Sequence, residues 1–348
     1  MKRIVIMVKA VVPLMIILFF PLIASAKTTL PDLEQKTEKG SIISPESNKS
    51  NSEQAKEHFQ KGLKHSQSGQ LDFAILEYRK ALELDPNLTI AYVNVGVSYI
   101  QKKEYDTAVQ ALKKAIQKDS KLKLAHYNLW WAYRQQGKYD QGIDELKKII
   151  AFDPNDIKIY KNLGDSYLSD KKMVPEAIHM YSQGLAIDKS DVSLLQKLGK
   201  AYELDRQWDK AIEQLQRVVE LDKKNLYNYL FLYIALRKSG KNSEAKEIIQ
   251  KSLTDFRGKP WAASSSSEET VHLLEYLAGT YSEKDLLSSK NSIIVCQANY
   301  YIGMNYVFQN KPKEASQYFQ QAIDTKINFI SEYEYAKIEL DRIQNPKK

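Results

Sequence analysis

The sequence has few of the residues on which catalytic and metal-binding sites depend. It contains one cysteine, Cys296, and five histidines among 348 residues. A single cysteine excludes a disulfide bond within the chain. No two histidines have the spacing of a metal-binding pair on a helix, and the motifs HExxH, GxSxG and a glycine-rich phosphate loop are all missing. The sequence therefore predicts a non-enzyme that has no catalytic residues, no metal and no cofactor.

An excess of charge of one sign is also missing. Residues 1–26 contain three basic residues and no acidic one, so the rest of the chain has 48 basic and 43 acidic residues, a net charge of +5. This small excess is spread over 322 residues, whereas nucleic-acid-binding domains gather their basic residues on one face. We therefore predict no nucleic-acid partner.

The N-terminal residues have the pattern of a secretory signal. A positively charged start, "MKR", precedes an apolar run at residues 10–23, and "ASA" at 24–26 offers small residues to signal peptidase. The pattern predicts a signal peptide over residues 1–26, cleaved near Ala26, and an exported protein that is periplasmic or secreted. The alternative is an uncleaved N-terminal helix that anchors the protein to the membrane. Residues 27–52 are rich in Ser, Lys, Glu and Thr and predict a disordered tether.

From residue 53 to residue 256 the sequence repeats with a period of about 34 residues, in six copies. Each copy has a small residue, an aromatic residue three positions later, a second small residue nine positions further, a large apolar residue and a third small residue; in the second copy these are Gly96, Tyr99, Ala108, Leu112 and Ala115. This spacing predicts two amphipathic helices joined by a short turn, with small residues that let the two backbones approach. One pair cannot bury its apolar face alone, so successive pairs should stack.

The period is interrupted once before the chain ends. Residues 257–295 break it and predict a linker with two short helices, of which the second is capped by Ser282. A seventh copy follows at residues 296–330, and residues 331–348 predict a capping helix and a tail. The leading positions of the seven copies are Gly62, Gly96, Trp130, Gly164, Gly199, Leu232 and Gly303.

This pattern resembles the tetratricopeptide repeat (TPR). The resemblance implies an all-α fold: a right-handed superhelix, or α-solenoid, of about seven helix-turn-helix repeats with a C-terminal capping helix. It also implies a scaffold that binds partner proteins or extended peptides in its concave groove.

The C-terminal part has a resemblance of its own. "YLAGTYSEKDLL", "CQANYYIGMNYVFQNKPKEASQYFQQAI" and "NFISEYEYAKIEL" are similar to the closing segment of the bacterial envelope TPR lipoprotein, an adaptor for peptidoglycan hydrolases. The similarity implies partners in the cell envelope. This chain lacks the lipoprotein's cysteine at the cleavage site, so the same lipid anchor is not implied.

Three asparagines recur two residues before the leading small position. Asn94, Asn128 and Asn162 belong to consecutive copies and should line the concave face. O-GlcNAc transferase has similar repeats, and there such asparagines grip the backbone of an extended peptide, since an amide both donates and accepts hydrogen bonds. The resemblance implies a peptide-binding ladder here. The alternative is that these asparagines bond only to neighbouring helices.

The third copy has a tryptophan pair where its neighbours have glycine. Trp130 takes the glycine position, and the facing small position, alanine in most copies, is Gly142. Because glycine inside a helix costs about 1 kcal/mol relative to alanine, we expect Gly142 to make room for Trp130 in the core.

The adjacent residue should point elsewhere. Trp131 lies about 100° further around the helix, with Tyr127 and Arg134 on the same side. Aromatic residues beside arginine are typical of interface anchors, so these three residues are predicted to bind a partner. The alternative is that the tether or an adjacent helix covers them.

Together these patterns predict an exported adaptor that acts through its concave face. Two other functions stay open. One is an assembly factor of a pilus, secretion or outer-membrane machine that docks folded partners on its outer or edge surfaces. The other is a regulatory subunit or carbohydrate-binding scaffold at the cell wall, whose aromatic residues could stack on sugar rings.

Overall fold

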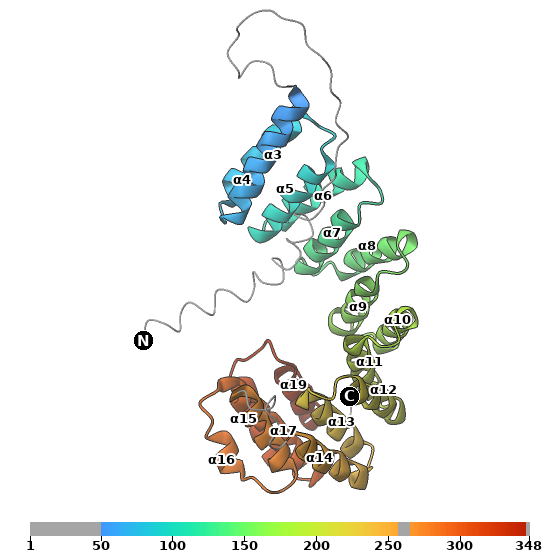
Figure 1. Ribbon diagram of the computed structural model, residues 1–348, viewed down its shortest axis with the longest axis vertical. Helices are drawn as coiled ribbons and strands as arrows, with labels where there is room; N and C mark the ends of the chain where they lie inside the picture. The colour runs from blue at the N-terminus through green and yellow to red at the C-terminus, as the bar shows by residue number, and fades with distance from the viewer. Residues whose placement is uncertain (1–49, 257–264, 346–348) are drawn as a thin grey trace, which may run out of the picture. The chain divides into compact units, whose positions relative to one another are not determined.

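The computed structural model describes residues 50–256 and 265–345 (Figure 1). The predicted signal peptide at 1–26, the predicted tether up to residue 49, residues 257–264 and the last three residues lie outside this description. Every regular element in the described residues is a helix. In these same residues, no helix combines the length and the apolar character that crossing a bilayer requires.

Six helix pairs follow one another and form repeats 1–6. They are α3 (Asn51–Gln67) with α4 (Leu71–Leu84), α5 (Thr89–Gln101) with α6 (Tyr105–Lys118), α7 (Lys123–Gln135) with α8 (Tyr139–Phe152), α9 (Ile157–Asp165) with α10 (Val174–Ile187), α11 (Val192–Leu204) with α12 (Trp208–Leu221), and α13 (Leu226–Lys238) with α14 (Asn242–Phe256). The first pair begins two residues before the predicted boundary at 53, because Ser50 and Glu53 form a reciprocal capping box.

In the five repeats whose leading residue is glycine, a large side chain from the second helix of the same repeat packs against that glycine. A Cβ atom added to Gly62 would lie 2.5 Å from the ring of Tyr78, and one added to Gly96 would lie 2.6 Å from Cγ of Leu112. Only glycine therefore fits these positions at the observed helix separation. In repeat 6 this position belongs to Tyr233 rather than to Leu232 as predicted, because Tyr233 precedes Ala245 by the same twelve residues that separate Gly62 from Ala74.

The helix pairs form two layers. Figure 1 shows the first helices α5, α7, α9 and α11 in one layer and the second helices α6, α8, α10 and α12 in the other. Each second helix also packs on the first helix of the next repeat. The all-α solenoid of helix-turn-helix repeats that the sequence predicts is therefore confirmed.

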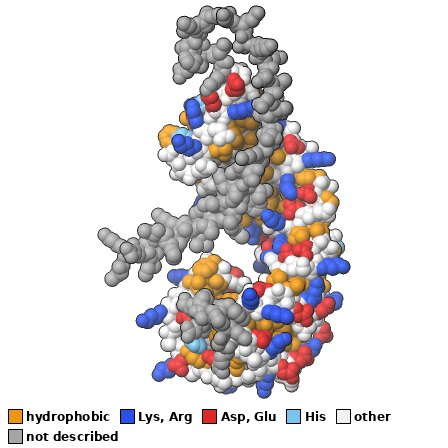
Figure 2. Space-filling view, viewed as in Figure 1, with side chains coloured by type: hydrophobic (Ala, Val, Ile, Leu, Met, Phe, Trp, Pro, Cys, Tyr) orange, Lys and Arg blue, Asp and Glu red, His pale blue; other side chains and the backbone are white. Residues whose placement is uncertain are grey.

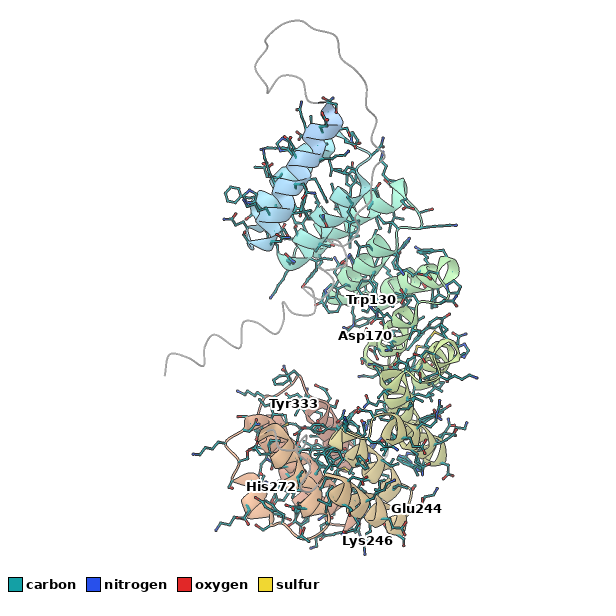
Figure 3. All side chains as sticks on the ribbon, in the orientation of Figure 1. Trp130, Asp170, Glu244, Lys246, His272 and Tyr333 are labelled. Carbon is teal, nitrogen blue, oxygen red and sulfur yellow. The ribbon has the colours of Figure 1, made fainter. Side chains whose placement is uncertain are left out.

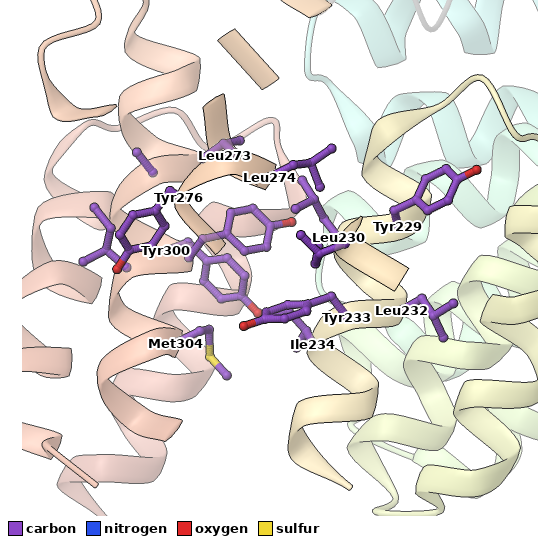
Figure 4. Packing of buried hydrophobic residues seen from close by; sticks show 14 of the residues in the cluster. Tyr229, Leu230, Leu232, Tyr233, Ile234, Leu273, Leu274, Tyr276, Tyr300 and Met304 are labelled. Carbon is purple, nitrogen blue, oxygen red and sulfur yellow. The ribbon is translucent and has the colours of Figure 1, made fainter. Parts of the chain in front are cut away.

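The last five helices do not simply extend this row. They are α15 (Ser265–Leu277), α16 (Glu283–Leu287), α17 (Ser292–Phe308), α18 (Pro312–Asp324) and α19 (Ser331–Gln344). Helix α17 begins four residues before the predicted start of repeat 7 at 296. It pairs with α18, as the repeat requires, and it also packs on α13, α15 and α19. We call α13–α19 the C-terminal module. Its buried residues, together with a few from α12, form the most extensive apolar core of the described chain (Figure 4).

Candidate binding surface

The first helix of each repeat has one side turned away from its second helix. We call this side the inner face; it consists of the residues six, three and two before the glycine position and the residue after it. In α5, Ile90, Asn94 and Val97 of this face are half-buried, and its fourth residue, Val93, is buried. Ala91 and Gly96 on the other side are also buried. Helix α5 also contacts α7, so the inner faces of consecutive repeats adjoin.

Trp130 is a core residue, as predicted. It is 5% exposed, and its indole N–H donates a hydrogen bond of 3.1 Å to the hydroxyl of Ser166 in repeat 4. A Cβ atom added to Gly142 would lie 3.1 Å from Cδ1 of Trp130 and 3.2 Å from its carbonyl oxygen. These distances are shorter than ordinary van der Waals contact. The geometry therefore agrees with the expectation that glycine at position 142 makes room for tryptophan at position 130.

Trp131 lies on the inner face and is half-buried. Its ring centroid is 5.8 Å from that of Trp130, which in turn is 5.0 Å from that of Tyr127. The guanidinium carbon of Arg134 is 5.8 Å from the Trp131 ring centroid. The structure thus brings the predicted aromatic residues and Arg134 together in α7.

Arg134 already has a partner that the sequence did not reveal. Its Nε and a terminal nitrogen donate hydrogen bonds of 2.8 and 3.0 Å to the two carboxylate oxygens of Asp170. The Asp170 side chain is only 9% exposed. Arg134 therefore joins repeat 3 to repeat 4 and is held in place beside Trp131.

The three asparagines do not form a uniform ladder. The Nδ2 of Asn128 donates a 2.8 Å hydrogen bond to the carbonyl of Leu124 in its own helix, and the Nδ2 of Asn162 lies 3.5 Å from the Tyr127 hydroxyl. The Nδ2 of Asn94 is buried without a hydrogen-bond partner among the described residues. Asn162 therefore contacts the neighbouring helix α7, whereas Asn128 bonds within its own helix.

The extra residue of repeat 4 forms a short π-helix. Helix α9 ends at Asp165 and continues as a π-helix, η1, over Ser166–Asp170. This segment supplies both Ser166, which accepts a hydrogen bond from Trp130, and Asp170, which accepts two from Arg134. Figure 3 labels Trp130 and Asp170. The sequence signal was the interval of 35 residues between Gly164 and Gly199 in place of 34.

Beyond repeat 3 the inner face becomes charged. Lys161 forms an ion pair of 2.8 Å with Asp191, and Lys197 forms one of 2.8 Å with Asp165. Figure 2 shows basic and acidic side chains interspersed over the visible face of the repeats. These pairs, which sequence analysis missed, link repeat 4 to repeat 5.

The cysteine lies in the core. The Cys296 thiol is buried 3.4 Å from the carbonyl oxygen of Ala322, and burial raises the pKa of the thiol. Over residues 50–256 and 265–345, no group of three or more His, Cys, Asp and Glu side chains is arranged to hold a metal ion.

Comparison with known proteins identifies the repeats. Family models for the tetratricopeptide repeat match residues 62–102, 99–164, 194–224 and 297–326. The crystal structure of a tetratricopeptide repeat protein from Parabacteroides merdae is similar over 84% of this chain and 100% of that chain, with 14% identity and a TM-score of 0.52. A search of curated proteins found no match.

Two further solved structures have smaller similar regions. MamA is 27% identical, with 49% of this chain and 93% of that chain covered and a TM-score of 0.45. PilF of Pseudomonas aeruginosa is 21% identical, with 63% and 100% covered and a TM-score of 0.45. The repeated helix pairs and the four matching family models together show that this chain is a tetratricopeptide-repeat protein.

Proposed function

We propose that this protein is a non-catalytic scaffold that holds protein partners against the inner face of repeats 2–4. The observation that carries the proposal is Trp131, a half-buried tryptophan on the inner face that is fixed between Trp130 and Arg134. A large side chain held in one position loses little conformational entropy when it binds, which makes it a suitable anchor. Tyr127 and Asn94 extend the same surface.

The proposed place of action is the cell envelope, and sequence patterns near both ends of the chain support it. The N-terminal pattern supports export to the periplasm or beyond, after cleavage near Ala26, with membrane attachment as the alternative if the segment is retained. The similarity of the C-terminal phrases to the envelope lipoprotein supports an adaptor role among cell-envelope proteins. Neither property depends on the geometry of the inner face.

Affinity capture from a cell-envelope extract tests the proposal. Replacing Trp131 with alanine should lower the amount of captured partner by at least about tenfold, because hot-spot aromatic residues carry about 2 kcal/mol or more of binding free energy. Phe73→Ala on the outer surface of α4 is the matched control, since Phe73 is 59% exposed. Thermal unfolding of both variants should stay close to that of the wild type.

One observation favours a second function, an assembly factor that docks folded partners on its outer surface. Phe73 and Leu76 on α4 are 59% and 48% exposed, whereas the equivalent residues of repeat 2 are Thr107 and Gln110. If Phe73→Ala abolished capture while Trp131→Ala did not, this second function would replace the first.

A further inference from the structure

The second helices of repeats 1–3 have a basic residue at one shared position. This position lies five residues after Ala74 and its equivalents, and it is Arg79 in α4, Lys113 in α6 and Lys147 in α8, all three exposed. We call these three residues the basic strip. The equivalent residues of repeats 4–7 are uncharged: Ser182, Gln216, Gln250 and Gln320.

Each residue of the basic strip lies over a tyrosine of the next repeat. The guanidinium carbon of Arg79 is 6.0 Å from the Tyr99 ring centroid, and a terminal nitrogen of Arg79 donates a 2.9 Å hydrogen bond to the Tyr99 hydroxyl. A tyrosine ring attracts a cation but does not neutralise its charge. The two lysines make the same ring contact through Nζ, at 6.0 Å for Lys113 and Tyr133 and at 5.9 Å for Lys147 and Tyr167.

The basic strip differs from the other cations of these repeats in having no acidic partner. Among the described residues, none of its three side chains forms an ion pair. Glu83 and Asp144 are exposed on the same helices, but neither reaches ion-pair distance of the strip. Nearby lysines are paired: Lys80 with Glu77, Lys148 with Glu145, Lys102 with Asp72, Lys138 with Asp106 and Lys171 with Asp140.

We propose that the basic strip binds an extended acidic segment of a partner protein. Successive second helices lie about 10 Å apart, and an extended chain advances about 3.3 Å per residue. An acidic residue at every third position of the segment would therefore meet one cation per repeat. The strip belongs to the second helices and not to the inner face, so this inference is independent of the scaffold function proposed for Trp131.

The arrangement of charge favours a narrow segment over an anionic membrane surface. Asp72, Asp106 and Asp140 lie seven residues before the strip residues of the same helices, and so on the same side and about 10 Å away. Their side chains are 79–89% exposed. A flat anionic surface would cover these carboxylates together with the cations, whereas a narrow segment can follow the basic strip alone.

The test uses two synthetic peptides of the same composition. The probe is a fluorescent peptide of about 12 residues with glutamate at every third position and serine and glycine between. Its isomer has all the glutamates together at one end. Fluorescence anisotropy with the full chain at low ionic strength should show that the probe binds at least about threefold more tightly, because only the probe can reach all three cations.

A triple variant locates the binding. Replacing Arg79, Lys113 and Lys147 with glutamine should weaken binding of the probe by at least about fivefold and reduce its dependence on salt concentration. The matched control replaces three exposed lysines of the loops between repeats with glutamine and so removes the same net charge; they are Lys189, Lys223 and Lys224. The control should change binding by less than about twofold.

Circular dichroism checks the fold of both triple variants. If the strip variant does not fold, Lys113→Gln in the middle of the strip takes its place, with Lys223→Gln as the control. Trp131→Ala should leave binding of the probe unchanged. The failure of this inference and the failure of the scaffold function are therefore distinguishable.

Four outcomes would overturn the inference. Absence of probe binding is the first, and equal weakening by the strip and control variants, which would mean that net charge alone acts, is the second. Equal binding of the two peptides would rule out the extended segment. Binding of the chain to phosphatidylglycerol vesicles that is lost in the strip variant, while neither peptide binds, would identify a membrane surface as the occupant instead.

Discussion

Trp130 and Tyr233 show how this chain places a large side chain where five of its repeats have glycine. Each of the two buries a polar group together with its ring, and each polar group has a partner: Ser166 for the Trp130 indole N–H and Arg237 for the Tyr233 hydroxyl, at 3.1 and 2.8 Å. A buried polar group without a partner costs about 1–3 kcal/mol. These hydrogen bonds therefore help to make the substitutions tolerable.

A double-mutant cycle tests the exchange at Trp130. We expect Gly142→Ala to destabilise the wild type by about 1–2 kcal/mol, since the new Cβ would press on the Trp130 ring. In the Trp130→Ala background the same change should stabilise by up to about 1 kcal/mol, because alanine favours the helix. Urea unfolding of the four proteins gives the coupling energy. Additive effects would show that the glycine at position 142 is not needed to accommodate the Trp130 side chain.

His126 belongs to a buried charged group inside repeat 3. The ring is 2% exposed, its Nδ1 lies 2.6 Å from a carboxylate oxygen of Glu145, and its Nε2 lies 3.0 Å from the Ser120 carbonyl. Burial lowers the pKa of His126, but the hydrogen bonds to Glu145 and Ser120 outweigh it and raise this pKa above 6.5. Burial raises the pKa of Glu145, but hydrogen bonds from His126 and Lys148 bring it below 4.5.

These shifts predict a pH window for the stability of repeat 3. The raised pKa of His126 means that its contribution is complete below pH 6.5 and is lost as the pH rises through the folded-state pKa. The lowered pKa of Glu145 means that its contribution is lost as the pH falls through a value below 4.5. The stability difference between wild type and His126→Gln should therefore be largest between these limits, at about 1–3 kcal/mol. Urea unfolding from pH 4 to pH 9 measures it, with the exposed His179→Gln as control; a flat difference would contradict the assignment.

The repeat pattern predicts packing within one repeat, but it does not specify the register between repeats or the rotamers of single side chains. The burial of Trp130 and its relation to Gly142 follow from spacing within one repeat. The two hydrogen bonds between Arg134 and Asp170 join residues 36 positions apart. Whether these side chains face each other depends on where the extra residue of repeat 4 is inserted. Side-chain hydrogen bonds such as that of Asn128 to Leu124 depend on rotamers, which a repeat pattern does not specify.

At the scale of single elements, the π-helix η1 is the main departure from the repeat. A π-turn inserts one residue into a helix without ending it, and such turns are often found at functional sites. Here the insertion lies at the C-terminal end of the first helix of repeat 4, and it places Ser166 and Asp170 against repeat 3. The period of 35 residues signals an insertion, but a longer turn would have produced the same period.

Asp170→Ala tests whether η1 fastens repeat 4 to repeat 3. The change leaves Arg134, which is half-buried, without its carboxylate, and we expect a loss of about 1–2 kcal/mol after allowance for the partial exposure of the pair. Asp106→Ala is the matched control, because Asp106 pairs with Lys138 across the preceding junction at 3.7 Å while 89% exposed. Its loss should be below about 0.5 kcal/mol. Equal losses in the two variants would show that the ion pair between Arg134 and Asp170 stabilises the protein no more than an exposed surface pair does.

For the molecule as a whole, the repeat predicts the helix pairs but not the packing of repeat 7 onto repeat 6. A repeat in a regular row has one exposed side on its first helix, whereas α13 and α17 have nine and ten buried residues. Helices that are apolar on all sides are buried on all sides. The run "LYNYLFLYIALRK" of α13, which is apolar over most of its length, contains this signal.

Charged residues fasten the end of the C-terminal module to the repeats. Lys238 of α13 lies 2.8 Å from Glu339 of α19 and 3.6 Å from Glu203 of α11, and all three side chains are at most 10% exposed. Arg342 contacts Glu339 as well, at 2.9 Å. Burial raises the pKa of Glu339, but Lys238 and Arg342 outweigh burial and hold this pKa below 4.5, so the carboxylate is ionised at neutral pH. Removing Lys238 would leave two buried carboxylates with less compensating charge.

Lys238→Met should therefore destabilise the C-terminal module by about 3–5 kcal/mol, the usual result of breaking a buried charge pair. Because repeat proteins are stabilised by contacts between neighbours, the loss should stay local. Hydrogen exchange followed by mass spectrometry should show faster exchange in α13, α17 and α19, with α5–α8 unchanged. Lys337→Met, which removes an exposed pair with Glu334, should change neither region. Faster exchange throughout α3–α19 would mean that the repeats and the C-terminal module unfold as one cooperative unit. The contact of Lys238 would then stabilise all the repeats rather than the C-terminal module alone.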